Sequence, residues 1–150
     1  MNALHVFDLL GGAKVFGSNT AQLSTSDPLA WDQRIVGGLP IEALENLLNE
    51  LRLPRKALLT SMGLNPRWLQ RQRKAGKTTL DAIIGARVVA VAHLVVEAIR
   101  VLGSQEAAER RLSSPKKSLG GTVPLDLAGR YFGNQAVLDR LSSIDHGFCA

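Results

Sequence analysis

A strongly basic stretch, residues 53–77, constrains the fold of this 150-residue chain more than any other feature. With Arg52 it holds eight of the 18 Lys and Arg residues, and no Asp or Glu falls between Glu50 and Asp81. The stretch reads as two short helices joined by a tight turn at Gly63-Leu64-Asn65. Positive charge gathered on such a helix pair is typical of surfaces that bind phosphate.

The composition predicts an all-α fold. Hydrophobic residues make up 45% of the chain but aromatic residues only 5%, so the core is aliphatic and suited to helices packed on helices. A single cysteine, Cys149, excludes a disulfide framework. The most apolar run, residues 83–102, is interrupted by four ionisable side chains, so we expect a core helix and no membrane partner. The N-terminus lacks the features of a secretory signal, and we therefore expect a cytoplasmic protein.

Apolar spacing predicts most of the helices. After a polar stretch at residues 17–28, a helix follows Pro40, and a long helix covers about 79–102 with Thr78 and Asp81 as its capping box. A helix at about 123–132 is predicted to stop at Gly133, and Asn134 is predicted to cap the last helix. We divide the chain into an arm or linker (1–34), a helix-turn-helix domain (35–80) and a C-terminal helical domain (81–150).

The second helix of the basic pair, residues 66–74, predicts a DNA-reading face. Four of its polar side chains recur at helical spacing on one side: Arg67, Gln70, Arg71 and Lys74. Arg pairs with guanine and Gln with adenine in the major groove. Flanking cations are expected to contact phosphates: Arg55, Lys56 and Lys77, with Arg52 and Arg73. Leu69 points the other way, into the core, and Trp68 is expected to be half-buried.

Two sets of short motifs resemble one family. Residues 98–104 (AIRVLGS) and 119–127 (LGGTVPLDL), followed by Gly133, Val137, Leu141, Ile144 and Gly147, resemble the C-terminal toxin-binding domain of the Xre/MbcA/ParS antitoxins. Upstream, residues 38–40 (GLP) and 63–71 (GLNPRWLQR) resemble the Xre-like DNA-binding part of the same antitoxins. The resemblance covers about residues 35–150. One departure is Arg111, where the family usually has Trp.

The resemblance implies a function that composition does not show. Such antitoxins are encoded beside RES-domain toxins, which consume NAD; they bind the toxin, close its active-site entrance and repress the shared promoter. They typically self-associate, so a homodimer or a higher assembly with the toxin is implied. The implied toxin-binding residues are Gly121, Pro124, Leu125, Val137, Leu141, Asp145, Gly147, Phe148 and Ala150. In this reading Phe148 is an apolar anchor, and Asp145 with the terminal carboxylate pairs with cationic groups of the toxin.

No other constellation in the chain carries chemistry. The three histidines, His5, His93 and His146, lie far apart in the sequence, so we predict no metal site. A nucleophilic pair of His146 and Cys149 at the end of the chain could not be held in register. We therefore expect no catalytic residues and no cofactor. The alternative to an antitoxin is a stand-alone helix-turn-helix regulator with a helical dimerisation domain.

Overall fold

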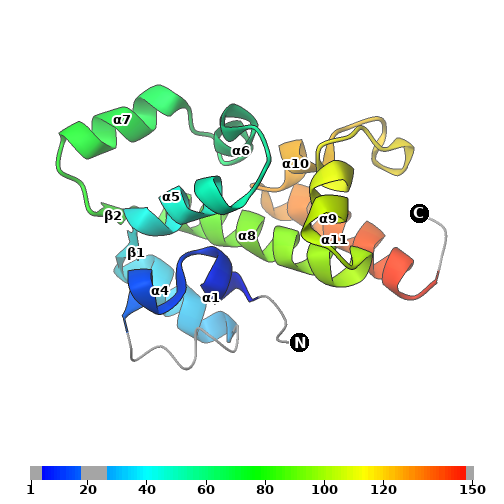
Figure 1. Cartoon of the computed structure of the whole chain (residues 1–150), viewed down its shortest axis with the longest axis horizontal. Helices are drawn as coiled ribbons and strands as arrows, with labels where there is room; N and C mark the ends of the chain where they lie inside the picture. Colours follow the sequence, from blue (N-terminus) through cyan, green and yellow to red (C-terminus); the bar gives the residue numbers. More distant parts are fainter. Residues whose placement is uncertain (1–4, 18–26, 148–150) are drawn as a thin grey trace.

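The computed structural model describes residues 5–17 and 27–147, and it confirms the all-α prediction apart from one two-stranded sheet (Figure 1). The elements in chain order are α1 (Val6–Leu9), α2 (Gly12–Phe16), α4 (Pro28–Gly38), β1 (Leu39–Pro40), α5 (Ile41–Glu50), α6 (Arg55–Ser61), α7 (Pro66–Lys74), β2 (Thr79–Leu80), α8 (Ala82–Leu102), α9 (Gln105–Leu112), the 3-10 turn η1 (Lys117–Leu119), α10 (Pro124–Leu127) and α11 (Tyr131–Asp145).

Helix α8 is the central element of the fold, and Figure 1 shows it running through the middle of the molecule. Helices α1, α4, α9 and α11 all pack against it. Its inward residues are buried: Val88, Val91, Ala92, Leu94, Val95 and Ala98. The helix has the length and hydropathy of a membrane span, but these side chains have partners within the protein. Core packing therefore explains the apolar residues on its buried face.

The predicted start of this central helix is wrong by three residues. Thr79 and Leu80 pair antiparallel with β1, with Leu39 opposite Leu80, so the chain is extended where a helix was expected. The helix begins at Ala82, and Asp81 alone caps it, its carboxylate accepting a hydrogen bond from the Ile84 amide at 2.9 Å. The short sheet overrides the capping box predicted at Thr78, because its strand hydrogen bonds involve the very residues that the predicted first turn needs.

The predicted boundary between the last two helices is also wrong. Helix α10 is a single turn, and α11 already begins at Tyr131, so Gly133 and Asn134 lie inside it. The buried Asn134 side chain does not cap; its amide donates to the carbonyls of Ala90 (3.1 Å) and Ala128 (2.7 Å). A side chain on Gly133 would collide with the backbone of the α10 turn. Both residues allow neighbouring helices to pack closely, and this tertiary role cannot be predicted from local sequence patterns.

Aromatic side chains hold the described part of the N-terminal stretch in the core. Phe16 lies between Phe7 and Trp31, with ring centroids 5.7 and 5.6 Å apart, and all three residues are buried. The Asn46 amide of α5 donates to the carbonyl of Leu9 at 2.9 Å. Helix α1 therefore packs on α5 and α8, and α2 packs on α1 and, through Phe16, on Trp31 of α4; these contacts contribute to the stability of the fold.

The C-terminal helices are joined directly to the basic helix pair. From α9, the Gln105 amide donates to the Glu50 carbonyl at 2.9 Å, and the Glu109 carboxylate accepts from the Arg52 amide. Helix α10 packs on α6, and a Cβ on Gly129 would overlap the Ser61 carbonyl. These contacts fix the loop before α6 and the end of α6, so the two halves of the chain share one core.

Candidate functional site

Helices α6 and α7 form the helix-turn-helix that the sequence predicts. Gly63 has a φ of +75°, which favours glycine, and the following Leu64 turns inward and is buried. Asn65 caps α7 by accepting a hydrogen bond from the Trp68 amide at 2.9 Å. Leu69 of α7 is buried with Leu58, Leu59 and Met62 of α6, and Trp68 is half-buried. The apolar side of α7 is thereby fixed against the core, which presents its polar side to solvent.

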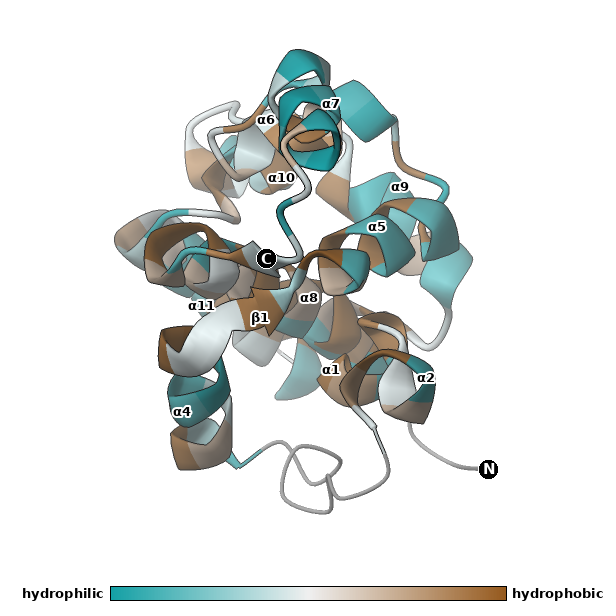
Figure 2. Cartoon of the chain, turned by 90° about the vertical axis from the view of Figure 1, so that its left-hand side faces the viewer, coloured by the Kyte–Doolittle hydropathy of each residue, from teal (hydrophilic) through white to brown (hydrophobic). Residues whose placement is uncertain are grey.

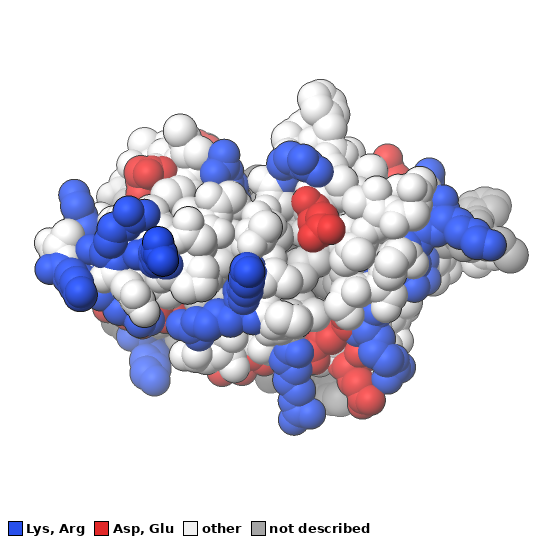
Figure 3. Space-filling view, turned by 90° about the horizontal axis from the view of Figure 1, so that it is seen from above, with Lys and Arg blue, Asp and Glu red and all other residues white. Residues whose placement is uncertain are grey.

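All nine residues predicted to contact DNA are exposed: Arg52, Arg55, Lys56, Arg67, Gln70, Arg71, Arg73, Lys74 and Lys77. Figure 2 shows α7 as one of the most hydrophilic elements of the fold. In Figure 3, Lys and Arg gather at the left end of the molecule, where α7 lies in Figure 1. The members of this set on α7 therefore lie at one accessible, positively charged end, and Arg55 and Lys56 lie on α6, nearer the middle of the molecule.

Arg73 differs from its neighbours on α7. Its Nε lies 2.9 Å from a Glu45 carboxylate oxygen, so it ties α7 back to α5. The Arg55 guanidinium makes a longer hydrogen bond, 3.4 Å, to the Asn49 side chain. We had expected Arg73 as a flanking phosphate contact, but in the free protein its charge is already paired.

The residues that the resemblance assigns to toxin binding are divided between the core and the surface. Leu125, Val137 and Leu141 are 2–3% exposed, and Pro124 is also buried, so in the free chain they pack within the fold. Gly121, Asp145 and Gly147 are exposed. Phe148 and Ala150 lie outside the described residues. The buried members of this set shape the C-terminal helices, and only the exposed members can touch a partner without rearrangement.

Arg100 was missed as a site residue, and it holds Asp145 in place. Its guanidinium bonds both Glu97 on its own helix (3.0 Å) and Asp145 near the end of α11 (3.2 Å). The hydrogen bond and charge of Glu97, followed by those of Asp145, raise the pKa of Arg100, so it stays protonated. The only sequence indication was that Glu97 and Arg100 share a side of the long helix. The contact with Asp145 depends on tertiary structure.

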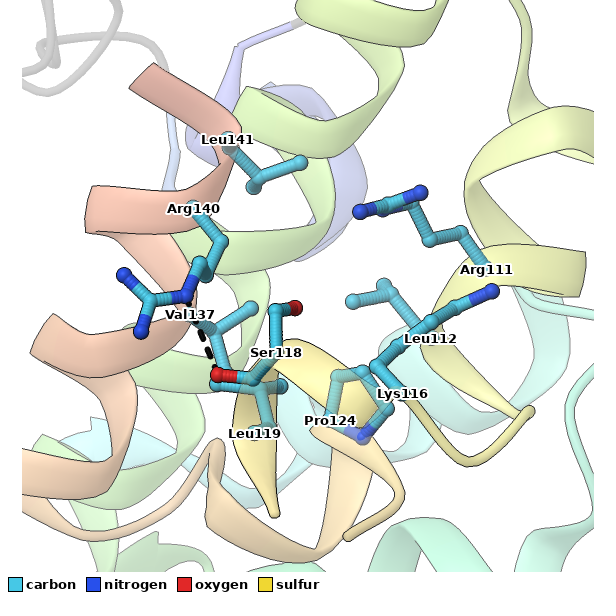
Figure 4. A pocket seen from close by; sticks show the side chains of 9 residues that line it. All are labelled: Arg111, Leu112, Lys116, Ser118, Leu119, Pro124, Val137, Arg140 and Leu141. Atoms are coloured by element: carbon cyan, nitrogen blue, oxygen red, sulfur yellow. Dashed lines mark hydrogen bonds between the residues drawn. The ribbon is translucent and has the colours of Figure 1, made fainter. Parts of the chain in front are cut away.

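Cationic residues also surround a narrow pocket between α9, the η1 turn and α11. Figure 4 shows Arg111 and Lys116 on one side of this pocket and Arg140 on the other. Its apolar lining comes from Leu112, Leu119, Pro124, Val137 and Leu141. The pocket volume is about 10 Å³, room for no more than one water molecule. A small-molecule cofactor therefore does not fit there.

The ionisable residues that the structure describes are not arranged for metal binding. No group of three or more His, Cys, Asp or Glu side chains among them is placed to hold an ion. His93 and His146 line an open groove of about 460 Å³ between α8 and α11, and both are exposed. The His146 ring nitrogen is within 2.8 Å of the Ser142 carbonyl, which is an ordinary helix-end contact.

Comparison with protein families assigns both halves of the chain. Residues 30–93 match the antitoxin Xre-like helix-turn-helix domain, and residues 97–147 match the antitoxin Xre/MbcA/ParS C-terminal toxin-binding domain. No curated protein matches the chain in a sequence comparison. The two matched domains meet within α8, and both belong to non-catalytic families.

Proposed function

Because the chain belongs to the Xre-type antitoxins, we propose a specific antitoxin role for it. Its helix-turn-helix implies DNA binding, and its C-terminal domain implies a toxin partner. The protein neutralises a RES-domain toxin that consumes NAD, by closing the toxin's active site with its C-terminal region. It also represses its own operon, which places it in the cytoplasm with its operator.

The observation that carries this proposal is the position of the two surfaces on one body. Helix α7 and the C-terminal end of α11 lie at opposite ends of the molecule (Figure 1). A toxin bound at α11 therefore leaves α7 free to enter the major groove, so one chain is able to hold both partners. This separation matches a protein that neutralises a toxin and represses a promoter at the same time.

The end of α11 has the chemistry for closing a site that binds a dinucleotide. Asp145 presents a carboxylate beside the point where the last residues leave the helix, and it is the kind of group that pairs with phosphate-binding cations. Phe148 adds an apolar side chain that anchors in a cleft. In this proposal the toxin's cations compete with Arg100 for Asp145.

Deleting residues 147–150 tests the blocking role directly. Cells that express the toxin should lose protection, while the truncated protein should bind operator DNA as the full chain does, because α7 lies at the far end. The matched control is Cys149→Ser, which keeps Phe148 and the length of the chain and should protect fully. Continued protection by the truncated protein would show that the C-terminal residues do not block the toxin.

Repression requires the protein to read an operator, and α7 offers one reading helix per chain. We propose that two copies, as a homodimer or within a larger assembly with toxin, place two α7 helices on two half-sites. Light scattering of the protein alone and with toxin measures this stoichiometry. A strictly monomeric protein that protects one half-site in footprinting would contradict the assembly.

A further inference from the structure

Three cations around the pocket of Figure 4, Arg111, Lys116 and Arg140, lack acidic partners, unlike two neighbouring Arg residues of the C-terminal helices. Arg110 pairs with Glu106 at 3.0 Å, and Arg100 pairs with Glu97 and Asp145. Among the described residues, no carboxylate lies within 4 Å of the charged groups of Arg111, Lys116 and Arg140. We call these three residues, with the apolar lining given above, the cationic notch.

Hydrogen bonds fix the Arg140 side chain and the Lys116 backbone before any partner arrives. The Arg140 Nε donates to the Ser118 carbonyl at 3.1 Å, which leaves its terminal nitrogens available. The backbone of Lys116 is fixed by pairing with Thr122, where the amide-to-carbonyl distance is 3.1 Å. Arg111 is only partly exposed and extends across the pocket (Figure 4). Cations that are already ordered lose little conformational entropy when they bind an anion.

The shape of the notch indicates what kind of anion it takes. Arginine forks pair with carboxylates and phosphates alike. Here, however, the cations flank a shallow apolar floor whose open volume, about 10 Å³, leaves room only for the edge of a small apolar group. A phosphate backbone offers no such group, whereas a protein segment with acidic residues on either side of a small apolar side chain fits both the charge and the floor.

The position of the notch indicates which protein would carry that segment. Arg140 precedes Gly147 on α11 by seven residues, about 10 Å along a helix with a rise of about 1.5 Å per residue. A toxin whose active site admits the end of the chain therefore has its rim beside the notch. Resting on the function proposed above, we propose that the cationic notch binds an acidic segment of the toxin and adds to its affinity.

A matched pair of variants on one helix tests this. Arg111→Gln removes an unpaired notch cation, and Arg110→Gln removes the adjacent cation that Glu106 already pairs. We expect Arg111→Gln to raise the Kd for catalytically inactive toxin roughly tenfold and to reduce its salt dependence, with Arg110→Gln near wild type. The double variant Arg111→Glu with Arg140→Glu should weaken binding further. Operator binding by each variant confirms that it is folded, and Lys116→Ala is a second, milder notch variant.

The outcomes separate this proposal from the function on which it rests. Wild-type binding of toxin with equal affinity for all notch variants overturns the notch and leaves the antitoxin role intact. Loss of operator affinity with unchanged toxin affinity means that the notch contacts phosphates, which also overturns the proposal.

If the wild type does not bind RES toxin, the proposed function fails, and a synthetic Glu-Ala-Glu peptide then tests the notch separately. Shifts of the Ser118 and Leu119 amide resonances with this peptide, and not with Lys-Ala-Lys, support it; their absence overturns it.

Discussion

The α7 end and the C-terminal helices present their site residues in opposite ways. Every residue predicted to contact DNA is exposed and comes from one short stretch of the chain. All four motif positions assigned to toxin binding between residues 124 and 141 are buried. A charged stripe on a helix thus predicts which residues contact a partner. An apolar motif instead predicts buried residues, which support the contact surface without forming it. The predictions below test this difference by separating effects on binding from effects on stability.

The largest effect is expected from Leu125→Ala. This side chain is 2% exposed within the core under α10, so its truncation leaves a cavity and should lower the free energy of unfolding by about 3 kcal/mol. Chemical denaturation measures this change. Because α10 packs on α6, DNA binding should weaken together with toxin binding at temperatures near the new midpoint. A variant of unchanged stability that has lost only toxin binding would show that Leu125 is a contact residue after all.

Asn134→Ala should give the next largest loss. The amide of Asn134 satisfies two carbonyls, Ala90 and Ala128, from different elements, and removing it leaves both without that donor. A cost of about 2 kcal/mol in unfolding free energy is expected. Asn134→Asp is the matched control, because it keeps the shape but cannot donate; it should be at least as destabilising. If Asp is tolerated and Ala is not, shape rather than hydrogen bonding explains the residue.

The same contrast explains what the sequence could predict. Helical spacing and capping chemistry located α5, α6, α7 and the bulk of α8, because local patterns there agree with the fold. Asn134 reads locally as a cap, yet it bonds across to α8. Arg100 reads as a surface cation, yet it reaches α11 to hold Asp145. Both depend on which helices meet, and the spacing of residues within a single helix carries no information about that.

A smaller effect, on binding and not on stability, is expected from Arg71→Ala. This side chain is exposed on α7, so the unfolding free energy should change by less than about 0.5 kcal/mol. Loss of one two-pronged base contact should cost about 1–3 kcal/mol in operator binding and relax specificity at one base pair. Binding to an operator library measures both. Arg73→Ala is the comparison, since Glu45 already pairs that residue, and it should leave sequence preference unchanged.

The smallest effect is expected from Lys77→Ala. Lys77 follows α7 in an exposed segment, where it is suited to a phosphate and not to a base edge. Its loss should lower affinity evenly across operator sequences and reduce the slope of log K against log salt by about one. A salt titration on the operator and on a scrambled duplex measures this. If Lys77→Ala instead changed the preferred sequence, Lys77 would contact a base, and the residues that read the operator would extend beyond the C-terminal end of α7.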